Sequence, residues 1–335
     1  MKALVVVPDA VELQEVGDPS AKSGEVVVSV HSCGICGSDV HSVEFGTRKL
    51  GQILGHEFAG TVVEIGPDVT GWRVGDAVAV NPHGHCGHCD WCKRDVSVRC
   101  PNAPHLGLSE PGGYAEYVAV PAVQVAALPP GTTLEQGAHV EPLAVAVRAI
   151  REAQLSGGED VLVFGAGPIG LRVIMAARAL GAGRVIALEI SPARAAAAGA
   201  VGADEVLDTR EVDLAAFAEE RGLRFAVALE CAGVPPALDA CAEAVAGGGT
   251  IVQVAMGRIP SPLLTARFVS KNLKLVSSTV FGPGDFVQAL ALITTGVLNM
   301  DPLVSERIPL AAAPEAFQRL RNPQDSVGIL VQPGR

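Results

Sequence analysis

Four closely spaced cysteines limit what this chain can fold into more than any other feature. Cys86, Cys89, Cys92 and Cys100 stand within GHCGHCDWCKRDVSVRC, with gaps of two, two and seven residues between them. Protein-bound zinc takes four ligands in a tetrahedron, and two-residue gaps let one loop supply several thiolates to a single ion. Four thiolates leave no coordination position open. The quartet therefore predicts a structural zinc site, and any chemistry must lie elsewhere in the chain.

A redox-active cluster or a disulfide-bonded loop is the alternative interpretation of the quartet. Disulfides are typical of exported proteins, and we expect no secretory signal peptide at the start of the chain, which reads MKALVVVPDA. Reduced thiolates that bind a metal are therefore the preferred interpretation.

Composition and charge restrict the class of partner. The chain has 335 residues, of which 49% are hydrophobic, which is enough for two globular domains. Its net charge of −11 disfavours binding to nucleic acid or to an anionic membrane surface. No apolar run reaches the ~18 residues of a membrane-spanning helix. We expect an acidic, cytoplasmic protein that acts on a small molecule, with no nucleic-acid or membrane partner.

The pattern of apolar residues changes near residue 142. Before it, short β-branched runs such as EVVVSV, AGTVVEI, DAVAV and YAEYVAV alternate with Gly, Pro and Asp, which predicts an antiparallel β-rich domain. After it, strand and helix patterns alternate, which predicts a doubly wound parallel sheet. The six expected strands are 161–164, 185–188, 205–207, 226–230, 250–254 and 273–277.

The predicted fold class is therefore α/β, with two domains. The segment 281–335 carries two helical patterns, 285–295 and 314–320, and is too short to form a domain by itself. We expect this segment to dock on one of the two domains.

A glycine-rich turn opens the alternating half of the chain. Gly165, Gly167 and Gly170 follow an apolar strand and precede a helix in VLVFGAGPIGLRVIMAARALGA. Such glycines permit a tight turn and let a pyrophosphate approach the helix N-terminus, where free N–H groups favour negative charge. Pro168 and Ile169, in the same turn, belong to the expected cofactor site. A glycine turn without a ligand is the alternative.

An acidic residue closes the next strand and predicts the identity of the cofactor. Glu189 stands nineteen residues after Gly170, where it would accept hydrogen bonds from the adenosine ribose hydroxyls. A carboxylate at that point repels the 2′-phosphate of NADP, so NAD is the expected cofactor. We expect Arg194 to flank the ribose, and Val254 and Met256 to lie near the nicotinamide. A solvated surface glutamate is the alternative.

A second candidate metal site precedes the quartet, in CGICGSDVHS and GHEFAG. Cys36 and His56 offer a thiolate and an imidazole, which suit zinc, and Glu57 or Glu141 could add a carboxylate oxygen. Three protein ligands leave a fourth position open for water or substrate, so this site would be catalytic. The alternatives are a buried structural histidine and a dithiol pair of Cys33 with Cys36.

The order of these segments resembles that of a known enzyme family. CGICGSDVH, GHEFAGTVVEIG, the quartet, GGYAEYV, EPLAVAV, GAGPIG and ALECAG occur as in the zinc-dependent medium-chain alcohol and polyol dehydrogenases, over nearly the whole chain. GICGSDVH and VEPLAVAV are most similar to the sorbitol, threonine and butanediol dehydrogenase branch. The resemblance implies a GroES-like catalytic domain of residues 1–142 and 281–335, interrupted by a Rossmann domain at 143–280 that binds NAD.

The resemblance also assigns roles to single residues. It implies that Cys36 and His56 bind a catalytic zinc ion, with Glu57 and Glu141 as ligands or near-ligands. Asp39 matches the residue that holds the His56 ring in the tautomer able to bind a metal.

The implied reaction is a reversible hydride transfer between NAD and a secondary alcohol, diol, polyol or cyclitol, with zinc lowering the pKa of the alcohol. Ser38 matches the residue that takes the proton of the substrate, and His41 matches the one that passes it to solvent through the cofactor ribose. Cys33 has no such role, and we interpret it as a packing residue.

The substrate pocket is less constrained by the sequence. Phe45, Thr47 and Leu108 are expected to line it. The segment after CGSDVH differs from the sorbitol-type loop, so the sugar-alcohol specificity does not transfer directly. Arg48 and Lys49 are interpreted as solvated surface charges rather than as ligands of an acidic substrate.

Three other functions remain as alternatives. The first is an amino-alcohol dehydrogenase of the threonine type. The second is a zinc-free, NADPH-dependent reductase of the same superfamily, and the third is a nucleotide-binding protein that has lost turnover. The metal-binding residues argue against the last two. The resemblance also implies a homodimer or homotetramer, formed partly through edge strands of the Rossmann sheet.

Overall fold

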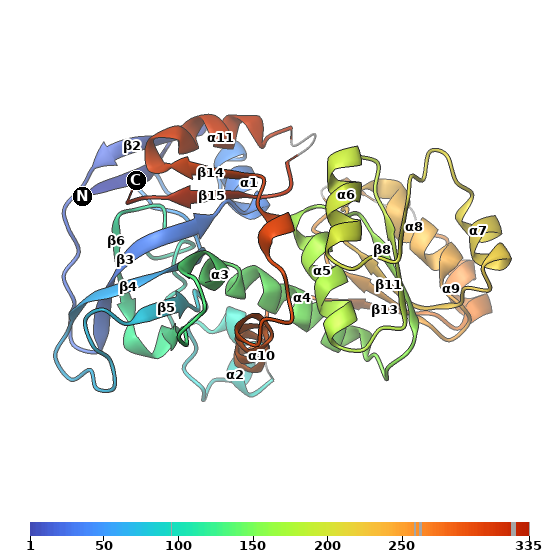
Figure 1. Ribbon diagram of the computed structural model, residues 1–335, viewed down its shortest axis with the longest axis horizontal. Helices are drawn as coiled ribbons and strands as arrows, with labels where there is room; N and C mark the ends of the chain where they lie inside the picture. Colours follow the sequence, from blue (N-terminus) through green and yellow to red (C-terminus); the bar gives the residue numbers. More distant parts are fainter. Residues whose placement is uncertain (95, 258, 261–262, 323–325, 335) are drawn as a thin grey trace. The chain divides into compact units, whose positions relative to one another are not determined.

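The computed structural model describes residues 1–94, 96–257, 259–260, 263–322 and 326–334. The chain forms two compact units (Figure 1). Unit 1 comprises Met1–Glu141, Gly282–Gly296 and Val304–Arg335, and unit 2 comprises Pro142–Phe281 and Val297–Leu303. Most of the tail thus returns to the first unit. The segment Val297–Leu303 lies with the second unit instead, which differs from the grouping expected from the sequence.

Unit 1 is built on one mixed β-sheet. In spatial order its strands are β14 (Glu306–Pro309), β15 (Ile329–Gln332), β3 (Glu25–Gly34), β4 (Glu57–Ile65), β5 (Ala77–Val80) and β7 (Val125–Ala127), and β6 (Tyr117–Pro121) also pairs with β3. β14 and β15 run parallel, and the other pairs described in this sheet are antiparallel. A separate antiparallel pair is formed by β1 (Lys2–Val7) and β2 (Ala10–Glu15).

The helices of unit 1 are short. They are α1 (Gly37–Glu44), α2 (Asp90–Lys93), α3 (Leu134–Ala138), α10 (Pro283–Thr294) and α11 (Ala313–Arg319), with 3-10 turns at Ser97–Arg99, Ala122–Gln124 and Leu310–Ala312. A capping box starts α3, because the Thr133 side chain accepts from the N–H of Gln136 while the Gln136 side chain accepts from Thr133.

Alternating valines explain the core of unit 1. Val26, Val28 and Val30 of β3 share one face of the strand and are at most 2% exposed. They belong to the same buried cluster as Phe58 of β4 and Phe317 of α11. A helix from near the end of the chain therefore completes a core that the first part of the chain begins.

Unit 2 is a Rossmann fold. Its six strands are all parallel and lie in the order β10, β9, β8, β11, β12, β13, the order of a doubly wound dinucleotide-binding sheet. In chain order they are β8 (Asp160–Phe164), β9 (Arg184–Leu188), β10 (Glu205–Leu207), β11 (Phe225–Glu230), β12 (Thr250–Gln253) and β13 (Lys274–Ser277), at or next to the six expected ranges. The α/β fold class predicted from the sequence is confirmed.

Helices cover both faces of this parallel sheet. They are α4 (Val140–Ala153), which begins at the boundary of the units, α5 (Pro168–Ala179), α6 (Pro192–Ala200), α7 (Leu214–Glu220), α8 (Pro235–Ala244), α9 (Thr265–Lys271) and the 3-10 turn η3 (Asp301–Leu303). In Figure 1, α5 and α6 lie on one face of the sheet, and α7, α8 and α9 lie on the other. Val161, Leu162 and Val163 of β8 are fully buried, because both faces of their strand are covered.

Candidate active site

The pairing of β3 with β4 brings the candidate zinc ligands together. Gly34, the last residue of β3, pairs with Glu57, the first residue of β4. Because the strands are antiparallel, Cys36, just after β3, and His56, just before β4, lie at the same edge of the sheet. One ligand atom each of Cys36, His56 and Glu57 lies within 4.8 Å of the other two.

The chemistry of this donor set fits a zinc ion. A thiolate, an imidazole and a carboxylate are zinc ligands, and three of them leave one position open. Burial and the charge of Glu57 raise the pKa of the Cys36 thiol. Burial lowers the pKa of His56, but Asp39 and Cys36 outweigh it and hold that pKa well above its ordinary value. Asp39 and Cys36 thus place two acidic groups beside one buried imidazole, which suits a divalent cation.

Asp39 lies directly behind His56. It is fully buried in the first turn of α1, and its Oδ1 is 3.4 Å from Nδ1 of His56. A carboxylate on the far nitrogen of a metal-binding histidine fixes the ring tautomer and orientation. The other oxygen, Oδ2, is 2.8 Å from the hydroxyl of Tyr114, a residue that the sequence motifs did not single out.

Ser38 and His41 follow on the same helix. The Ser38 hydroxyl donates to the Cys36 sulfur at 3.2 Å, so it stands at the edge of the metal-ligand cluster. His41 is more exposed, at 45% of its side chain, and its Nδ1 is 3.4 Å from Glu44. In the part of the chain that the structure describes, no hydrogen bond joins Ser38 to His41. A proton relay between them therefore needs an intervening group.

Glu141 lies beside a histidine that the sequence reading missed. Its Oε1 is 3.7 Å from Nε2 of His83, and both side chains are buried. Burial and the charge of His56 lower the pKa of His83 to about 3, so His83 is neutral. His83 follows β5, the antiparallel neighbour of β4, and this pairing is the signal that could have placed it beside His56. Glu57, and not Glu141, completes the tight cluster with Cys36.

Cys33 is a buried thiol. It is 0% exposed and contacts the carbonyl oxygen of Gly34, at 3.8 Å from its sulfur. Burial raises its pKa well above the ordinary value. Cys33 and Cys36 are both free thiols in the structure, with Cys33 buried and Cys36 half-buried.

The residues expected to form the substrate pocket lie on two surface segments. Phe45 is 56% exposed, Thr47 is exposed and Leu108 is half-buried. Arg48 is half-buried and donates to the carbonyl oxygen of Leu108 at 3.0 Å, which ties the two segments together. The expectation of a solvated charge is therefore wrong for Arg48, whereas Lys49 is exposed as expected.

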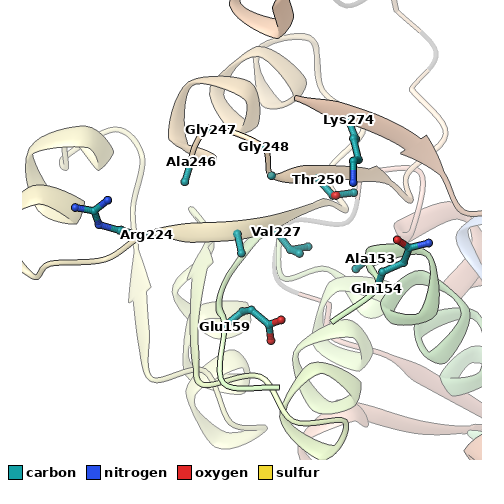
Figure 2. A pocket seen from close by; sticks show the side chains of 12 residues that line it. Ala153, Gln154, Glu159, Arg224, Val227, Ala246, Gly247, Gly248, Thr250 and Lys274 are labelled. Atoms are coloured by element: carbon teal, nitrogen blue, oxygen red, sulfur yellow. The ribbon is translucent and has the colours of Figure 1, made fainter. Parts of the chain in front are cut away.

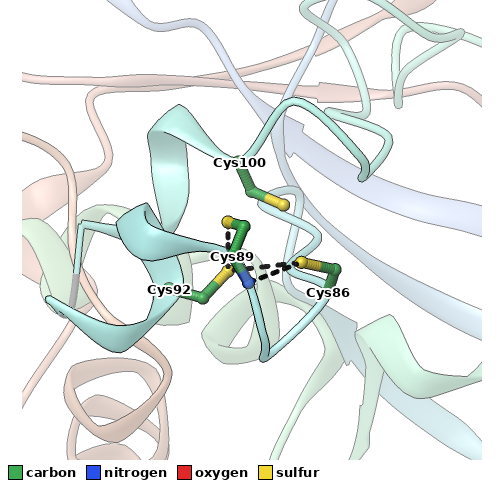
Figure 3. Close-up of side chains that lie close together, drawn as sticks. All are labelled: Cys86, Cys89, Cys92 and Cys100. Atoms are coloured by element: carbon green, nitrogen blue, oxygen red, sulfur yellow. Dashed lines mark hydrogen bonds between the residues drawn. The ribbon is translucent and has the colours of Figure 1, made fainter.

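The cysteine quartet has the geometry of a closed metal site. Figure 3 shows the four cysteine side chains grouped together. Their sulfur atoms all lie within 4.8 Å of one another. The Cys89 and Cys92 sulfurs are 3.4 Å apart, and those of Cys86 and Cys92 are 3.9 Å apart. Tetrahedral zinc with Zn–S bonds of ~2.3 Å requires about 3.8 Å between sulfurs. Backbone N–H groups of His88 and Cys89 lower the pKa of the Cys86 thiol, which favours the thiolate.

The glycine turn of unit 2 leaves room for a pyrophosphate. Gly165 has a φ of +94°, and Gly170 lies so close to the Gly165 carbonyl that a side chain there would overlap it. A Cβ on Gly167 would meet no protein atom within 4 Å. Gly167 is also the N-cap of α5, with no side-chain hydrogen bond at the cap, followed by the exposed Pro168 and the half-buried Ile169. This free helix terminus is suited to an anion.

Glu189 is neither solvated nor free of protein partners. Its Oε1 accepts from the N–H groups of Ile190 and Ser191 and from the Arg194 guanidinium at 2.9 Å, and its Oε2 accepts from the Ala166 N–H. It is 7% exposed. Arg194 thus pairs with the carboxylate expected to bind the ribose, a contact that the sequence pattern did not predict.

A buried glutamate, Glu230, supports the loop that follows β11 at the carboxyl edge of the parallel sheet. Glu230 ends β11, and its carboxylate accepts from the N–H groups of Ala232 and Gly233 and from the Gln253 side-chain amide. Its carbonyl oxygen accepts from the Val254 N–H at 2.9 Å. Met256, two residues on, is 89% exposed. Val254 and Met256 therefore follow β12 at the same carboxyl edge as Glu189.

The larger of two described cavities lies at the opposite edge of the parallel sheet. It measures about 400 Å³, and Figure 2 shows Glu159, Arg224, Thr250 and Lys274 around it. These residues precede or begin β8, β11, β12 and β13. Ligands of doubly wound sheets bind at the carboxyl ends of the strands, so this cavity is separate from the expected cofactor site.

Comparison with known protein families agrees with this geometry. Residues 22–130 match the family described as "Alcohol dehydrogenase GroES-like domain", and residues 168–295 match "Zinc-binding dehydrogenase". A curated relative, 2-dehydro-3-deoxy-L-galactonate 5-dehydrogenase of Pseudoalteromonas atlantica, is 35% identical over 90% of this chain and 90% of its own length. The chain belongs to the zinc-dependent medium-chain alcohol and polyol dehydrogenases. The family resemblance seen in the sequence is confirmed.

Solved structures support the membership of this zinc-dependent dehydrogenase in the family. The 2R,3R-butanediol dehydrogenase of Bacillus subtilis is 32% identical, with a TM-score of 0.90 over 99% of both chains. A zinc-binding dehydrogenase of Sinorhizobium meliloti bound to NADP is 30% identical, with a TM-score of 0.92 over 99% of both chains. An Escherichia coli alcohol dehydrogenase complexed with NADH is 26% identical, with a TM-score of 0.91 over the same share. In the described part of this chain, no helix has the length and apolar character needed to span a bilayer.

Proposed function

We propose that this dehydrogenase oxidises a small secondary alcohol, diol, polyol or cyclitol with NAD and reduces the matching ketone in the reverse direction. One feature supports this function above all. The buried cluster of Cys36, His56 and Glu57 offers three zinc ligands and leaves one position for a substrate oxygen. The glycine turn and Glu189 of unit 2 offer the features of a dinucleotide site.

Different residues of the chain would act on the zinc ion, on NAD and on the proton of the substrate. A zinc ion at this cluster would act as a Lewis acid on the substrate oxygen, and NAD would accept the hydride. Asp39 Oδ1, 3.4 Å from Nδ1 of His56, favours the tautomer that carries its proton on Nδ1, which keeps the other ring nitrogen available for the metal. The Ser38 hydroxyl, next to the Cys36 sulfur, is placed to exchange the proton of the alcohol. The exposed His41, three residues on, can release a proton to solvent.

A hydroxy acid is a second candidate substrate, and Arg48 favours it. In the described residues, no carboxylate lies within ion-pair distance of Arg48, and its Nε is buried without a hydrogen-bond partner. The Pseudoalteromonas relative is named for a sugar acid. The substrate panel should therefore contain each polyol beside the acid of the same carbon skeleton. Amino alcohols such as threonine belong on the same panel.

Metal analysis and a substrate screen test the proposal together. We expect two zinc ions per chain, one at the quartet and one at the Cys36 cluster, because the two donor sets are separate. Removal of the second ion should abolish NAD reduction by the active alcohol. One zinc or none in metal-replete protein, or turnover that survives loss of the second ion, would refute the proposed function.

We further propose a homodimer or homotetramer that forms partly through β13. This strand is the outer strand of the parallel sheet, and its Leu275 is 43% exposed. The preceding helix, α9, exposes 83% of Val269. An unpaired strand edge beside exposed apolar residues is suited to pairing with a second copy. A monomer in light scattering would reject this assembly. The eight free cysteines support a reducing, cytoplasmic location.

A further inference from the structure

A tyrosine outside the ligand set contacts the support of the candidate catalytic zinc. Tyr114 is 0% exposed, and its hydroxyl is 2.8 Å from Asp39 Oδ2 and 2.8 Å from the carbonyl oxygen of Gly34. Gly34 ends β3, two residues before Cys36. One hydroxyl thus touches the residue behind His56 and the backbone that leads to Cys36.

The position of Tyr114 is fixed from several sides. Its N–H donates to the carbonyl oxygen of Leu54, and its own carbonyl oxygen accepts from the N–H of Leu4. Its ring meets the Phe317 ring edge-on, with centroids 5.6 Å apart and planes at 85°. A buried side chain held by backbone and ring contacts has little freedom to turn its hydroxyl elsewhere. The hydroxyl oxygen is therefore fixed, and its single proton faces two acceptors, Asp39 Oδ2 and the carbonyl oxygen of Gly34.

Asp39 depends on that donor. The carboxylate is fully buried, and a buried carboxylate is strongly destabilised unless hydrogen bonds satisfy it. Oδ1 faces Nδ1 of His56, so Oδ2 needs a second partner. In the part of the chain that the structure describes, the Tyr114 hydroxyl is the group that donates to Oδ2. Without it, Asp39 could rotate away from His56.

We propose that Tyr114 is a positioning residue for the zinc ligand His56, acting through Asp39. The Tyr114 hydroxyl holds Oδ2, which aims Oδ1 at Nδ1–H of His56 and leaves Nε2 for the metal. The inference rests on the proposed ligation of zinc by Cys36 and His56.

Tyr114→Phe removes the hydroxyl and keeps the ring that meets Phe317. The chain contains a matched control, since Tyr117, on β6, is its second and last tyrosine and is 36% exposed. The readout is zinc affinity by competition with a chelator, in protein without cofactor, with the Cys36→Ala variant identifying the signal of the catalytic site. Loss of a residue that orients a metal ligand weakens metal binding by about 10–100-fold.

We expect that weakening for Tyr114→Phe and none for Tyr117→Phe, with the zinc of the quartet unchanged in both. A cobalt ion at the catalytic site should show an altered visible spectrum in Tyr114→Phe only. In a double-mutant cycle, Tyr114→Phe should add little to Asp39→Asn, because both act along one path. A purely structural role of the ring would not produce this non-additivity.

Several results would overturn the inference. These are wild-type zinc affinity and an unchanged cobalt spectrum in Tyr114→Phe, or additive effects in the cycle. An equal loss of zinc affinity in Phe317→Leu would assign the effect to ring packing instead of the hydroxyl. If Tyr114→Phe fails to fold, 3-fluorotyrosine can be incorporated into the Tyr117→Phe protein, where it labels Tyr114 alone. A fluorine chemical shift that does not change when zinc binds the catalytic site would then reject the inference. Absence of a second zinc in the wild type would instead refute the proposed function.

Discussion

Replacing Glu189 by Gln should move the cofactor preference from NAD toward NADP. The Glu189 carboxylate accepts from three backbone N–H groups and from Arg194. Burial alone would raise its pKa, but the hydrogen bonds from Arg194 and the backbone outweigh burial and lower it. Glu189 is therefore charged at neutral pH. The substitution keeps the size of the side chain and removes the charge.

The magnitude follows from two contributions. A ribose 2′-hydroxyl that donates to a charged acceptor contributes about 1.5–3 kcal/mol, and NADP lacks this donor. Two like charges 4 Å apart repel by about 4 kcal/mol at an effective dielectric constant of ~20. Arg194, 2.9 Å from Glu189, cancels part of that repulsion. With about two-thirds of the repulsion cancelled in this way, the sum is about 3–4 kcal/mol, so the wild type should prefer NAD by about 10²–10³-fold. In Glu189→Gln the preference should fall to about tenfold or less.

The assay is kcat/KM for NAD and for NADP with one active alcohol. Arg194→Gln is the matched control, because it keeps the carboxylate and removes the positive charge beside it. Its preference for NAD should therefore exceed that of the wild type. Equal use of both cofactors by the wild type would refute the reasoning. An unchanged ratio in Glu189→Gln, or a smaller preference in Arg194→Gln, would do the same.

Three further predictions concern the metal sites, the relay and the parallel sheet. Cys89→Ser should lower the zinc content from two ions to one and the Tm by several degrees, since a structural zinc contributes folding free energy. The kcat of the folded fraction should change little. A stable but inactive variant would contradict this prediction. Ser38→Ala should lower kcat by about 10²–10⁴-fold with NAD affinity intact, and His41→Ala should lower kcat less because water can replace a partly exposed group. Stopped-flow rates measure the first effect, and displacement of fluorescent NADH by NAD measures the cofactor affinity. Asp160→Asn should lower the free energy of unfolding at pH 7 by less than about 1 kcal/mol, because its partner Arg184 is partly exposed. Burial alone would raise the pKa of Asp160, but the Arg184 guanidinium and the N–H of Arg224 together outweigh burial and lower that pKa below its ordinary 3.8. Denaturant titrations should therefore show the difference shrinking as the pH falls below 3.8 and not at higher pH.

The features that were predictable from the sequence are those whose residues lie close together in the chain. The quartet lies in one loop, and the glycine turn lies between one strand and one helix. The six parallel strands were visible as apolar runs, because a strand covered on both faces excludes polar residues. Cys36 and His56 are twenty residues apart, and a known family pattern was needed to connect them.

The features that escaped the sequence reading depend on contacts between distant segments. Tyr114 and Asp39 are 75 residues apart, and no local period signals their hydrogen bond. His83 meets Glu141 only because β5 pairs with β4 and carries the following loop to the metal-ligand edge. Arg194 is close to Glu189 in sequence, but its rotamer depends on the surrounding fold.

The order in which the strands are made has a consequence for biosynthesis. β15 pairs with β3 at Cys33, three residues before Cys36, and Phe317 meets the ring of Tyr114. A ribosome therefore synthesises all six strands of the parallel sheet of unit 2 before it releases the strands that close the sheet beside the metal ligands. Cys36 and His56 therefore lie beside an incomplete sheet during most of translation, until β14 and β15 have been synthesised. We expect nascent chains stalled before β14 to show a protease-resistant nucleotide-binding unit but no high-affinity catalytic zinc, and zinc bound there at that stage would disprove late closure.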